Sequence, residues 1–353
     1  MRAGALMTDR RSLAPRPEAA EPNRRTILGG ALLAACGPAT GSAFHAGASV
    51  AAPLHDRHFA DEAAARRHER DLRFVDLQQG RIACIDRGAG PCALFLHGFP
   101  LTSFQWRDAT EALAAERRCL APDLMGLGRT EPVRGQGVAP ADQVAMLAAL
   151  LDRLHVSRVD VVANDCGGAI AQLFAIRFPS RVRSLLLTNC NVEIDSPPHA
   201  DPREIDRVRL GLLPDVSLWL DDKVLARSAE GLGGLGYSDP TCPGDPGIEE
   251  YLRPLVRDAA RKAMLRDLAL GLAAARPLQG AARRLRTLQA PIALVWGLAD
   301  TIVPRRNAND LASLFGSRVR LRGLETGKLF FPEEAPDVIV EEARRLWREG
   351  DAA

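Results

Sequence analysis

The sequence lacks a strong charge bias and also lacks the cysteine patterns of metal-binding or disulfide-rich proteins. Its 353 residues include 46 Lys and Arg against 44 Asp and Glu, so the formal net charge is +2. A balanced charge gives no electrostatic reason to expect a nucleic-acid partner. The seven cysteines form no Cys-x-x-Cys pair and no cysteine–histidine cluster at zinc spacing. We therefore expect no bound metal and no disulfide framework.

Tyrosine and histidine are scarce as well. The chain has two tyrosines, Tyr237 and Tyr251, and seven histidines, none of which follows His199. Few side chains are therefore available for the acid–base roles that these residue types often fill. Otherwise the composition is typical of a globular protein, with 46% hydrophobic and 25% charged residues. The length allows one large α/β domain with an inserted subdomain.

The first 36 residues have the pattern of an export signal. A polar, basic stretch ends in Arg24-Arg25 and is followed by the apolar run Thr26–Ala35. This run is too short to span a bilayer, which needs about 20 residues. The arginine pair resembles a twin-arginine signal, and Leu-Ala-Ala-Cys-Gly around Cys36 resembles a lipobox. We expect export to the periplasm or cell envelope, with membrane anchoring through a lipid on Cys36; a cytoplasmic protein with a disordered extension is the alternative.

From residue 73 onward, segments with strand and helix patterns alternate. Short apolar runs, typical of strands buried on both faces, are separated by stretches with helical spacing. The alternation predicts an α/β fold with a mostly parallel sheet and helices on both faces. It is interrupted at residues 191–288, which we interpret as an inserted helical cap. The core then comprises residues 73–190 and 289–353, preceded by a partly helical tether at 37–72.

The same patterns place the individual elements. Two strands should form a hairpin around Gly80, and the remaining strands and helices should alternate in the core. The expected strands are 73–77, 81–86, 92–96, one ending at 122, 159–163, 182–188, 292–296 and 318–321. The expected helices are 104–115, 141–154, 169–178, segments within 251–275, and 335–347.

A carboxylate stands where one of these strands meets a helix. The segment from Ala163 to Gly167 has the small-x-nucleophile-x-small pattern of a nucleophile elbow, with Asp165 in the middle. Such a turn exposes one side chain above the sheet, beside a helix N-terminus that favours negative charge. A carboxylate in this position suits attack at saturated carbon, which forms an alkyl ester. We therefore predict Asp165 to be a nucleophile.

Two backbone amides should polarise the carbonyl oxygen of that ester. By register, they are the amides of Phe99 and Cys166. Two other interpretations of the turn stay open. A shift by one residue would make Cys166 the nucleophile, although it would put Asn164 where a small residue is needed. Asp165 could also serve only as a helix N-cap.

Five motifs, in order along the chain, resemble those of α/β-hydrolase fold proteins. They are His97-Gly98-Phe99-Pro100, Asp123–Arg129, the elbow, Trp296–Asp300 and Gly327–Glu334. The elbow aspartate narrows the resemblance to haloalkane dehalogenases and epoxide hydrolases.

This resemblance implies a role for each matching residue. Asp165 would be the nucleophile, Asp300 the acid that orients a base, and Phe99 and Cys166 the oxyanion amides. His97 would be structural. The substrate would be a small molecule, and no cofactor is implied.

The sequence departs from this family at the catalytic histidine. Alignment of Phe330–Glu334 without a gap puts Leu329 at that position. Without a general base, hydrolysis of the ester loses help worth about 10²–10⁴-fold. Lys328 is adjacent, but we expect its side chain to point elsewhere, and it would need a lowered pKa to act as a base.

The usual halide donors are replaced too, because Phe99 and Cys166 occupy their positions. The remaining candidates for leaving-group donation are the indole N–H of Trp106 and the hydroxyls of Tyr237 and Tyr251. The tyrosines are considered because epoxide hydrolases use two cap tyrosines to protonate the epoxide oxygen.

Three functions follow, in order of preference. The first is a hydrolase that acts on carbon–halogen or epoxide bonds of a small apolar substrate through an Asp165 ester. The second is an envelope-anchored binding module, a pseudoenzyme that keeps the pocket without turnover, as Leu329 and Cys36 suggest. The third is an esterase or lactonase that uses Cys166 or an unusual base.

Overall fold

The structure is a computed structural model that describes residues 54–192, 216–274 and 277–351. The predicted export signal and Cys36 lie outside these ranges, as do residues 193–215 near the start of the predicted cap. Within the described ranges, no helix is long and apolar enough to cross a membrane.

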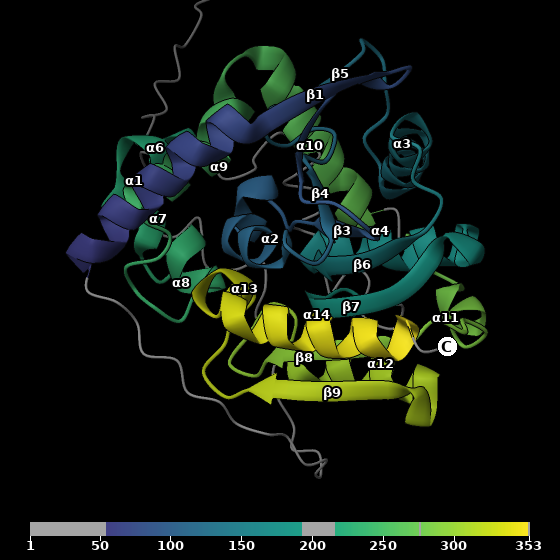
Figure 1. Ribbon diagram of the computed structural model, residues 1–353. Helices are drawn as coiled ribbons and strands as arrows, with labels where there is room; N and C mark the ends of the chain where they lie inside the picture. The colour runs from purple at the N-terminus through teal and green to yellow at the C-terminus, as the bar shows by residue number, and fades with distance from the viewer. Residues whose placement is uncertain (1–53, 193–215, 275–276, 352–353) are drawn as a thin grey trace, which may run out of the picture.

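A nine-stranded sheet forms the centre of the molecule (Figure 1). Its strands follow the order β1-β2-β4-β3-β6-β7-β8-β9, and the short β5 pairs with β2. The pairs β1–β2 and β2–β4 are antiparallel, whereas every pair from β4 to β9 is parallel. This arrangement confirms the predicted α/β fold with a mostly parallel sheet. The strands are β1 (Leu72–Leu77), β2 (Gly80–Arg87), β3 (Cys92–Leu96), β4 (Arg118–Pro122), β5 (Glu131–Pro132), β6 (Val159–Asn164), β7 (Val182–Cys190), β8 (Ile292–Gly297) and β9 (Val319–Leu324).

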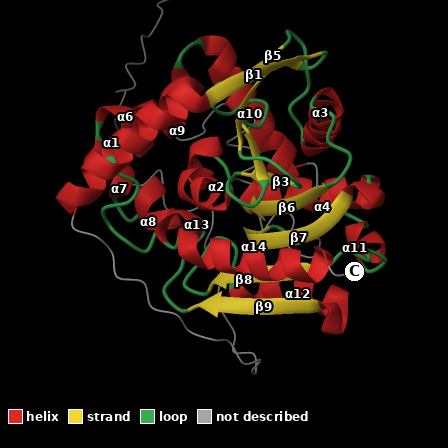
Figure 2. Cartoon of the chain, in the orientation of Figure 1, coloured by secondary structure: helices red, strands yellow, loops and turns green. Residues whose placement is uncertain are grey.

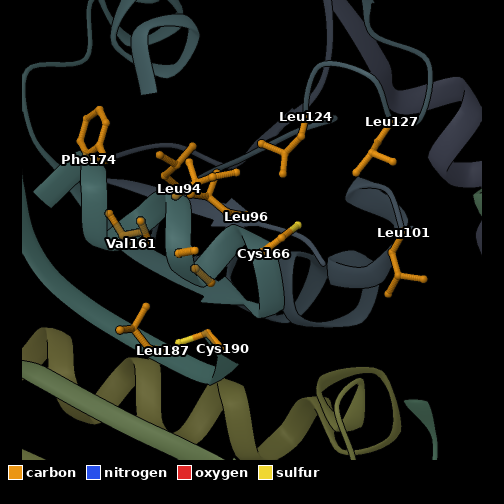
Figure 3. Packing of buried hydrophobic residues seen from close by; sticks show 14 of the residues in the cluster. Leu94, Leu96, Leu101, Leu124, Leu127, Val161, Cys166, Phe174, Leu187 and Cys190 are labelled. Carbon is orange, nitrogen blue, oxygen red and sulfur yellow. The ribbon is translucent and has the colours of Figure 1, made fainter. Parts of the chain in front are cut away.

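Helices cover both faces of the sheet (Figure 2). Alternate residues of a strand point to opposite faces. In β3, Phe95 therefore joins one apolar layer with α2 and α14. Leu94 and Leu96 join the other layer, with α3, α4 and α12. Figure 3 shows these two leucines among other residues of that layer. The helices of the core are α2 (Arg107–Leu113), α3 (Pro140–Arg153), α4 (Asp165–Arg177), α11 (Ala281–Leu285), α12 (Arg305–Phe315), α13 (Phe331–Glu334) and α14 (Pro336–Asp351), with 3-10 turns at Ser103–Trp106, Pro179–Arg181 and Gly316–Arg318.

A group of helices separates β7 from β8 in the chain. These helices lie within residues 191–288, where the alternation of strand and helix patterns is interrupted. One of them, α8, contacts the loops at the carboxyl ends of the strands, because the Phe330 amide donates to the Gly236 carbonyl at 2.8 Å. We call α6 to α10 the cap. Its helices are α6 (Ser217–Asp221), α7 (Lys223–Arg227), α8 (Leu232–Gly236), α9 (Asp245–Val256) and α10 (Ala259–Ala274).

One further helix precedes the sheet. α1 (Leu54–Asp71) packs against α9 of the cap and buries Ala64 and His68. The sequence predicts this part of the chain as a tether that is helical in part. The structure instead makes residues 54–71 a part of the folded body.

The core should be sensitive to truncation of its central strand. Leu94 in β3 is fully buried, whereas Leu218 in α6 is 53% exposed. We expect Leu94→Ala to lower the free energy of unfolding by about 2–5 kcal/mol, because a packed core cannot fill the cavity. Leu218→Ala should change it by less than about 0.5 kcal/mol. Urea unfolding followed by circular dichroism measures both values, and similar losses in the two variants would contradict this packing.

Candidate active site

Asp165 lies in the tight turn between β6 and α4. Its φ of 51° is in the left-handed region, which is unfavourable for a residue with a side chain. Two glycines allow this turn to pack: a Cβ at Gly167 would lie 2.5 Å from the carbonyl oxygen of Leu96, and a Cβ at Gly168 would lie 2.3 Å from Cβ of Cys190. The helix therefore begins directly against β3 and β7, and the turn presents Asp165 at the carboxyl edge of the sheet.

Backbone amides bind the carboxylate of Asp165. The amide of Phe99 donates to Asp165 Oδ2 at 2.8 Å, and the amide of Cys166 also donates to this carboxylate. Gly98 leaves space for the approach, because a Cβ there would lie 3.0 Å from Asp165 Oδ2. Burial raises the pKa of Asp165 to about 6, while the two amides act to lower it. The side chain is therefore ionised at neutral pH with one oxygen fixed in position.

Side-chain amides tie this turn to the loops on either side. Gln105 accepts a hydrogen bond from the Gly98 amide at 2.9 Å and donates to Asn164 Oδ1 at 2.7 Å. Asn164 Nδ2 donates to Thr188 Oγ1 and to the carbonyl oxygen of Leu329, both at 2.9 Å. The network fixes the spacing between the loop of Gly98, the elbow and the segment after β9. Sequence reasoning missed Gln105 in this role, because no motif marks a buried glutamine.

Asp300 lies in the loop after β8 and is 4% exposed. Asn189 Nδ2 donates to its Oδ2 at 2.7 Å, and the amide of Ile302 donates to its Oδ1 at 2.8 Å. Burial raises the pKa of Asp300 to about 7, and the nearby charge of Asp165 acts in the same direction. The structure thus brings the two predicted catalytic carboxylates within electrostatic reach of each other. Asn189 is a second functional residue that the sequence did not reveal.

Leu329 lies in the segment between β9 and α13. It is 3% exposed and belongs to the same apolar layer as Cys166. Its carbonyl oxygen is bound by Asn164, the neighbour of Asp165, so the segment passes beside the elbow. A leucine side chain can neither accept nor donate a proton. Asp300 therefore has no imidazole at residue 329 to orient.

His97 and Lys328 are both engaged in other contacts. The amide of Leu124 donates to His97 Nε2 at 3.0 Å, so we assign the ring proton to Nδ1, which donates to the Gly98 carbonyl at 2.9 Å. Burial also lowers the pKa of His97. Lys328 Nζ donates to the carbonyl oxygen of Gly234 in α8 at 2.7 Å. Neither side chain is placed as a base for an ester at Asp165.

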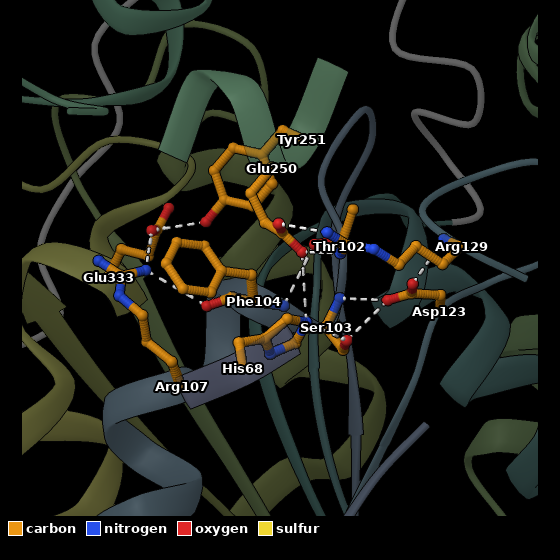
Figure 4. Close-up of polar contacts among 10 residues, drawn as sticks. All are labelled: His68, Thr102, Ser103, Phe104, Arg107, Asp123, Arg129, Glu250, Tyr251 and Glu333. Atoms are coloured by element: carbon orange, nitrogen blue, oxygen red, sulfur yellow. Dashed lines mark hydrogen bonds and ion pairs between the residues drawn. The ribbon is translucent and has the colours of Figure 1, made fainter. Parts of the chain in front are cut away.

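Two of the predicted leaving-group donors already have an acceptor, and the third lies in the other apolar layer. Tyr251 donates to the buried carboxylate of Glu333 at 2.6 Å (Figure 4). Tyr237 donates to the same carboxylate. Trp106 packs against Phe95 with ring centroids 5.7 Å apart, in the layer beneath α2 and α14. These placements correct the expectation from the sequence, because the tyrosine hydroxyls already have an acceptor and Trp106 lies on the face of the sheet opposite the Cys166 layer.

The Cys166 thiol is poorly suited to be the nucleophile. Cys166 is 2% exposed, and its Sγ lies 3.8 Å from the carbonyl oxygen of His97. Burial and the neighbouring charge of Asp165 hold the pKa of this thiol well above its usual value. A thiol that stays protonated is a weak nucleophile. Asp165 is therefore the elbow side chain that can react as an anion.

The buried environment of Asp165 predicts a pH-dependent gain in stability when its charge is removed. Folding raises the pKa from 3.8 to about 6, so the folded state binds more protons between these values and stability falls as the pH rises. Asp165→Asn removes that ionisation and should stabilise the protein at pH 8 by on the order of 2–3 kcal/mol. At pH 4 the two proteins should be about equally stable. Urea unfolding at both pH values measures the difference, and equal stability at pH 8 would contradict the burial of a charged Asp165.

Comparison with known proteins agrees with this geometry. Residues 94–227 match the family model described as alpha/beta hydrolase fold. Haloalkane dehalogenase 2 of Mycobacterium tuberculosis is 30% identical over 284 residues, which cover 76% of this chain and 92% of that protein. A cis-3-alkyl-4-alkyloxetan-2-one decarboxylase of Shewanella oneidensis is 30% identical over 119 residues, which cover 33% of this chain and 37% of that protein.

The likeness extends to solved structures. The haloalkane dehalogenase DbeA from Bradyrhizobium elkani matches with a TM-score of 0.63 at 24% identity, over 80% of this chain and 99% of that chain. This match supports the fold, and the sequence relatives support the family. The chain belongs to the α/β-hydrolase fold family and is related within it to the haloalkane dehalogenases.

Proposed function

We propose that Asp165 attacks saturated carbon and becomes an alkyl ester. The observation that carries this proposal is the hydrogen bond from the Phe99 amide to Asp165 Oδ2, at 2.8 Å. It fixes one oxygen of the carboxylate and leaves Oδ1 as the attacking atom. Residue 165 is partly exposed although its neighbours Asn164 and Cys166 are buried.

The first step requires no proton transfer when the leaving group is a halide. Oδ1 forms a bond to carbon as the carbon–halogen bond breaks, and the halide departs with the bonding electrons. Oδ2 becomes the carbonyl oxygen of the ester. The amides of Phe99 and Cys166 then stabilise negative charge on Oδ2 when the ester is attacked.

A halide fits this site better than an epoxide does. The oxygen of an opening epoxide needs a proton donor, but Tyr237 and Tyr251 both donate to Glu333. A halide leaves as a stable anion. The relation to haloalkane dehalogenase 2 of Mycobacterium tuberculosis points to the same substrate class.

The second step is slow in this proposal. Water attacks an ester efficiently only when a base accepts its proton, and residue 329 is a leucine. His97 and Lys328 are engaged in other hydrogen bonds. Both oxygens of Asp300 accept hydrogen bonds, from Asn189 and from the Ile302 amide, and Asp300 has no imidazole at residue 329 through which to act on water. We therefore infer that the alkyl ester accumulates on Asp165.

A second candidate function needs neither a base nor a proton donor, and Leu329 is the observation that favours it. In a β-lactone the leaving group is a carboxylate. Attack by Asp165 on the saturated ring carbon breaks its bond to oxygen and gives an alkyl ester with a free β-carboxylate. Loss of CO₂ then sends the electrons of the broken C–C bond into an alkene, and the Asp165 carboxylate departs. The relative from Shewanella oneidensis is named for decarboxylation of such a lactone.

Installing the missing base should convert a stalled ester into turnover. With 1-bromohexane, we expect the wild type to retain a hexyl ester on Asp165, found by intact mass and peptide mapping. Leu329→His should release 1-hexanol and lose the ester faster by about 10²–10⁴-fold, because it places an imidazole near Asp300. Quenched time courses of ester and alcohol measure both rates.

Three controls make this test specific. Leu329→Phe fills the position without a base and should keep the ester, whereas Asp165→Asn should form none. Fast alcohol release by the wild type would show that another base acts, and His199→Ala would test His199, which lies outside the described residues. If the wild type forms neither the ester nor the alcohol with any halide of a panel, that result would favour the binding-module hypothesis.

The second candidate predicts a different product. A cis-3,4-dialkyl β-lactone should give an alkene and CO₂ with the wild type and neither with Asp165→Asn. Headspace gas chromatography detects the alkene. Formation of a β-hydroxy acid would show hydrolysis instead, and an unchanged lactone would eliminate this candidate.

A further inference from the structure

The chain's two tyrosines meet at a single buried carboxylate. Tyr237, which follows α8, and Tyr251 of α9 both belong to the cap, and both donate to Glu333 of α13. Arg107 of α2 also donates to Glu333 from the core (Figure 4). One carboxylate thus joins two cap residues to a core helix that is distant in sequence.

This cluster is well shielded from water. The side chains of Arg107 and Glu333 are 13% and 5% exposed, and both tyrosines are fully buried. A buried charge is stable only when it is paired and hydrogen-bonded. Arg107 supplies the opposite charge, and the two phenols supply further donors. The ring of Phe104 lies against Tyr251, with centroids 5.8 Å apart, and completes the enclosure.

Packing contacts through Phe330 connect the cluster to Asp165. The ring of Tyr237 packs on that of Phe330 with centroids 5.5 Å apart, and the Phe330 amide donates to the Gly236 carbonyl at 2.8 Å. A Cβ built on Gly98 would lie 2.9 Å from Phe330 Cε1 and 3.0 Å from Asp165 Oδ2. The edge of the Phe330 ring and the reactive carboxylate therefore border the same point in space.

The cap holds the other side of this ring. A Cβ on Gly236 would lie 2.3 Å from Phe330 Cδ2, so the backbone of α8 lies directly against the aromatic ring. Phe330 is thus enclosed between Gly98 of the core and Gly236 of the cap, with Tyr237 packed on it. Its position depends on where α8 and Tyr237 are held.

We propose that Glu333 is a positioning residue that, by binding Tyr237 and Tyr251, fixes the Phe330 ring as the apolar wall beside Asp165 and so sets which alkyl groups reach the nucleophile. The inference rests on the proposed role of Asp165 as the nucleophile. Glu333 itself does not touch the reacting atoms. Its effect is transmitted by the packing of Tyr237 on Phe330.

The same cap helix offers a matched control. Glu250, the residue before Tyr251 in α9, pairs with Arg129 of the core, with one contact at 2.9 Å, and is 6% exposed. Glu250→Gln therefore removes a buried carboxylate that also joins cap to core, but among the described residues Glu250 has no direct hydrogen bond or ion pair with Glu333 or Tyr237. A general loosening of the cap would follow from either substitution, whereas a change at Phe330 should follow only from Glu333.

The test compares Glu333→Gln, Tyr237→Phe and Glu250→Gln with the wild type. Intact mass spectrometry gives the rate of Asp165 ester formation with 1-bromoalkanes from ethyl to decyl. Because one methylene in a fitted pocket is worth about tenfold or more in discrimination, we expect Glu333→Gln and Tyr237→Phe to shift the preferred chain length. Glu250→Gln should retain the wild-type preference. Tyr237→Phe loses a single hydroxyl and keeps the ring, so it serves if Glu333→Gln fails to fold.

Hydrogen–deuterium exchange supplies a readout that does not depend on chemistry. Glu333→Gln and Tyr237→Phe should speed exchange in a peptide containing Phe330, whose amide bonds to Gly236, and Glu250→Gln should not. An unchanged chain-length profile with unchanged exchange, or equal effects of Glu250→Gln, would overturn the proposal. If the wild type forms no ester with any bromoalkane, the proposed nucleophile fails, and the exchange data alone decide whether Glu333 positions Phe330.

Discussion

The hydrogen bond from the Phe99 amide to Asp165 Oδ2 is the contact on which the other features of the site depend. It requires the elbow to adopt a left-handed backbone at a residue with a side chain, and it requires glycine at Gly98, where a Cβ would meet the carboxylate. Gln105 and Asn164 then hold the two loops at the right separation. A strained backbone at Asp165 and several buried polar groups together fix the position of one oxygen atom.

The site combines two carboxylates of raised pKa, Asp165 and Asp300, with a leucine at residue 329. Burial raises the pKa of both Asp165 and Asp300, so each is costly to ionise. In the segment that Asn164 binds, a histidine at residue 329 could carry positive charge, but Leu329 cannot. In the proposed mechanism, the site supplies a nucleophile and two oxyanion amides but lacks the group that would direct water to the ester. Its chemistry is best matched by a substrate that brings its own stable leaving group.

The sequence was a good guide where local pattern determines structure. Short sequence segments and their spacing are enough to predict the buried strands, the elbow at Asp165 and the leucine at residue 329. The acceptor for the tyrosines could not be read, because Glu333 meets Tyr237 and Tyr251 only after the cap folds onto the core. Trp106 was predicted only as a candidate donor, and its neighbours in the sequence do not reveal which face of the sheet it covers. The supporting roles of Asn189 and Gln105 depend on contacts between distant segments and carry no motif.

The most direct test of the account follows the fate of the ester in H₂¹⁸O with 1-bromohexane under single-turnover conditions. Hydrolysis by attack on the ester carbonyl would put ¹⁸O into the Asp165 carboxylate. The account predicts about one bromide released per protein, a hexyl group retained on the peptide that contains Asp165, and no ¹⁸O in that peptide over the same period. Incorporation of ¹⁸O at the rate of bromide release would contradict it, because an efficient base would then be present.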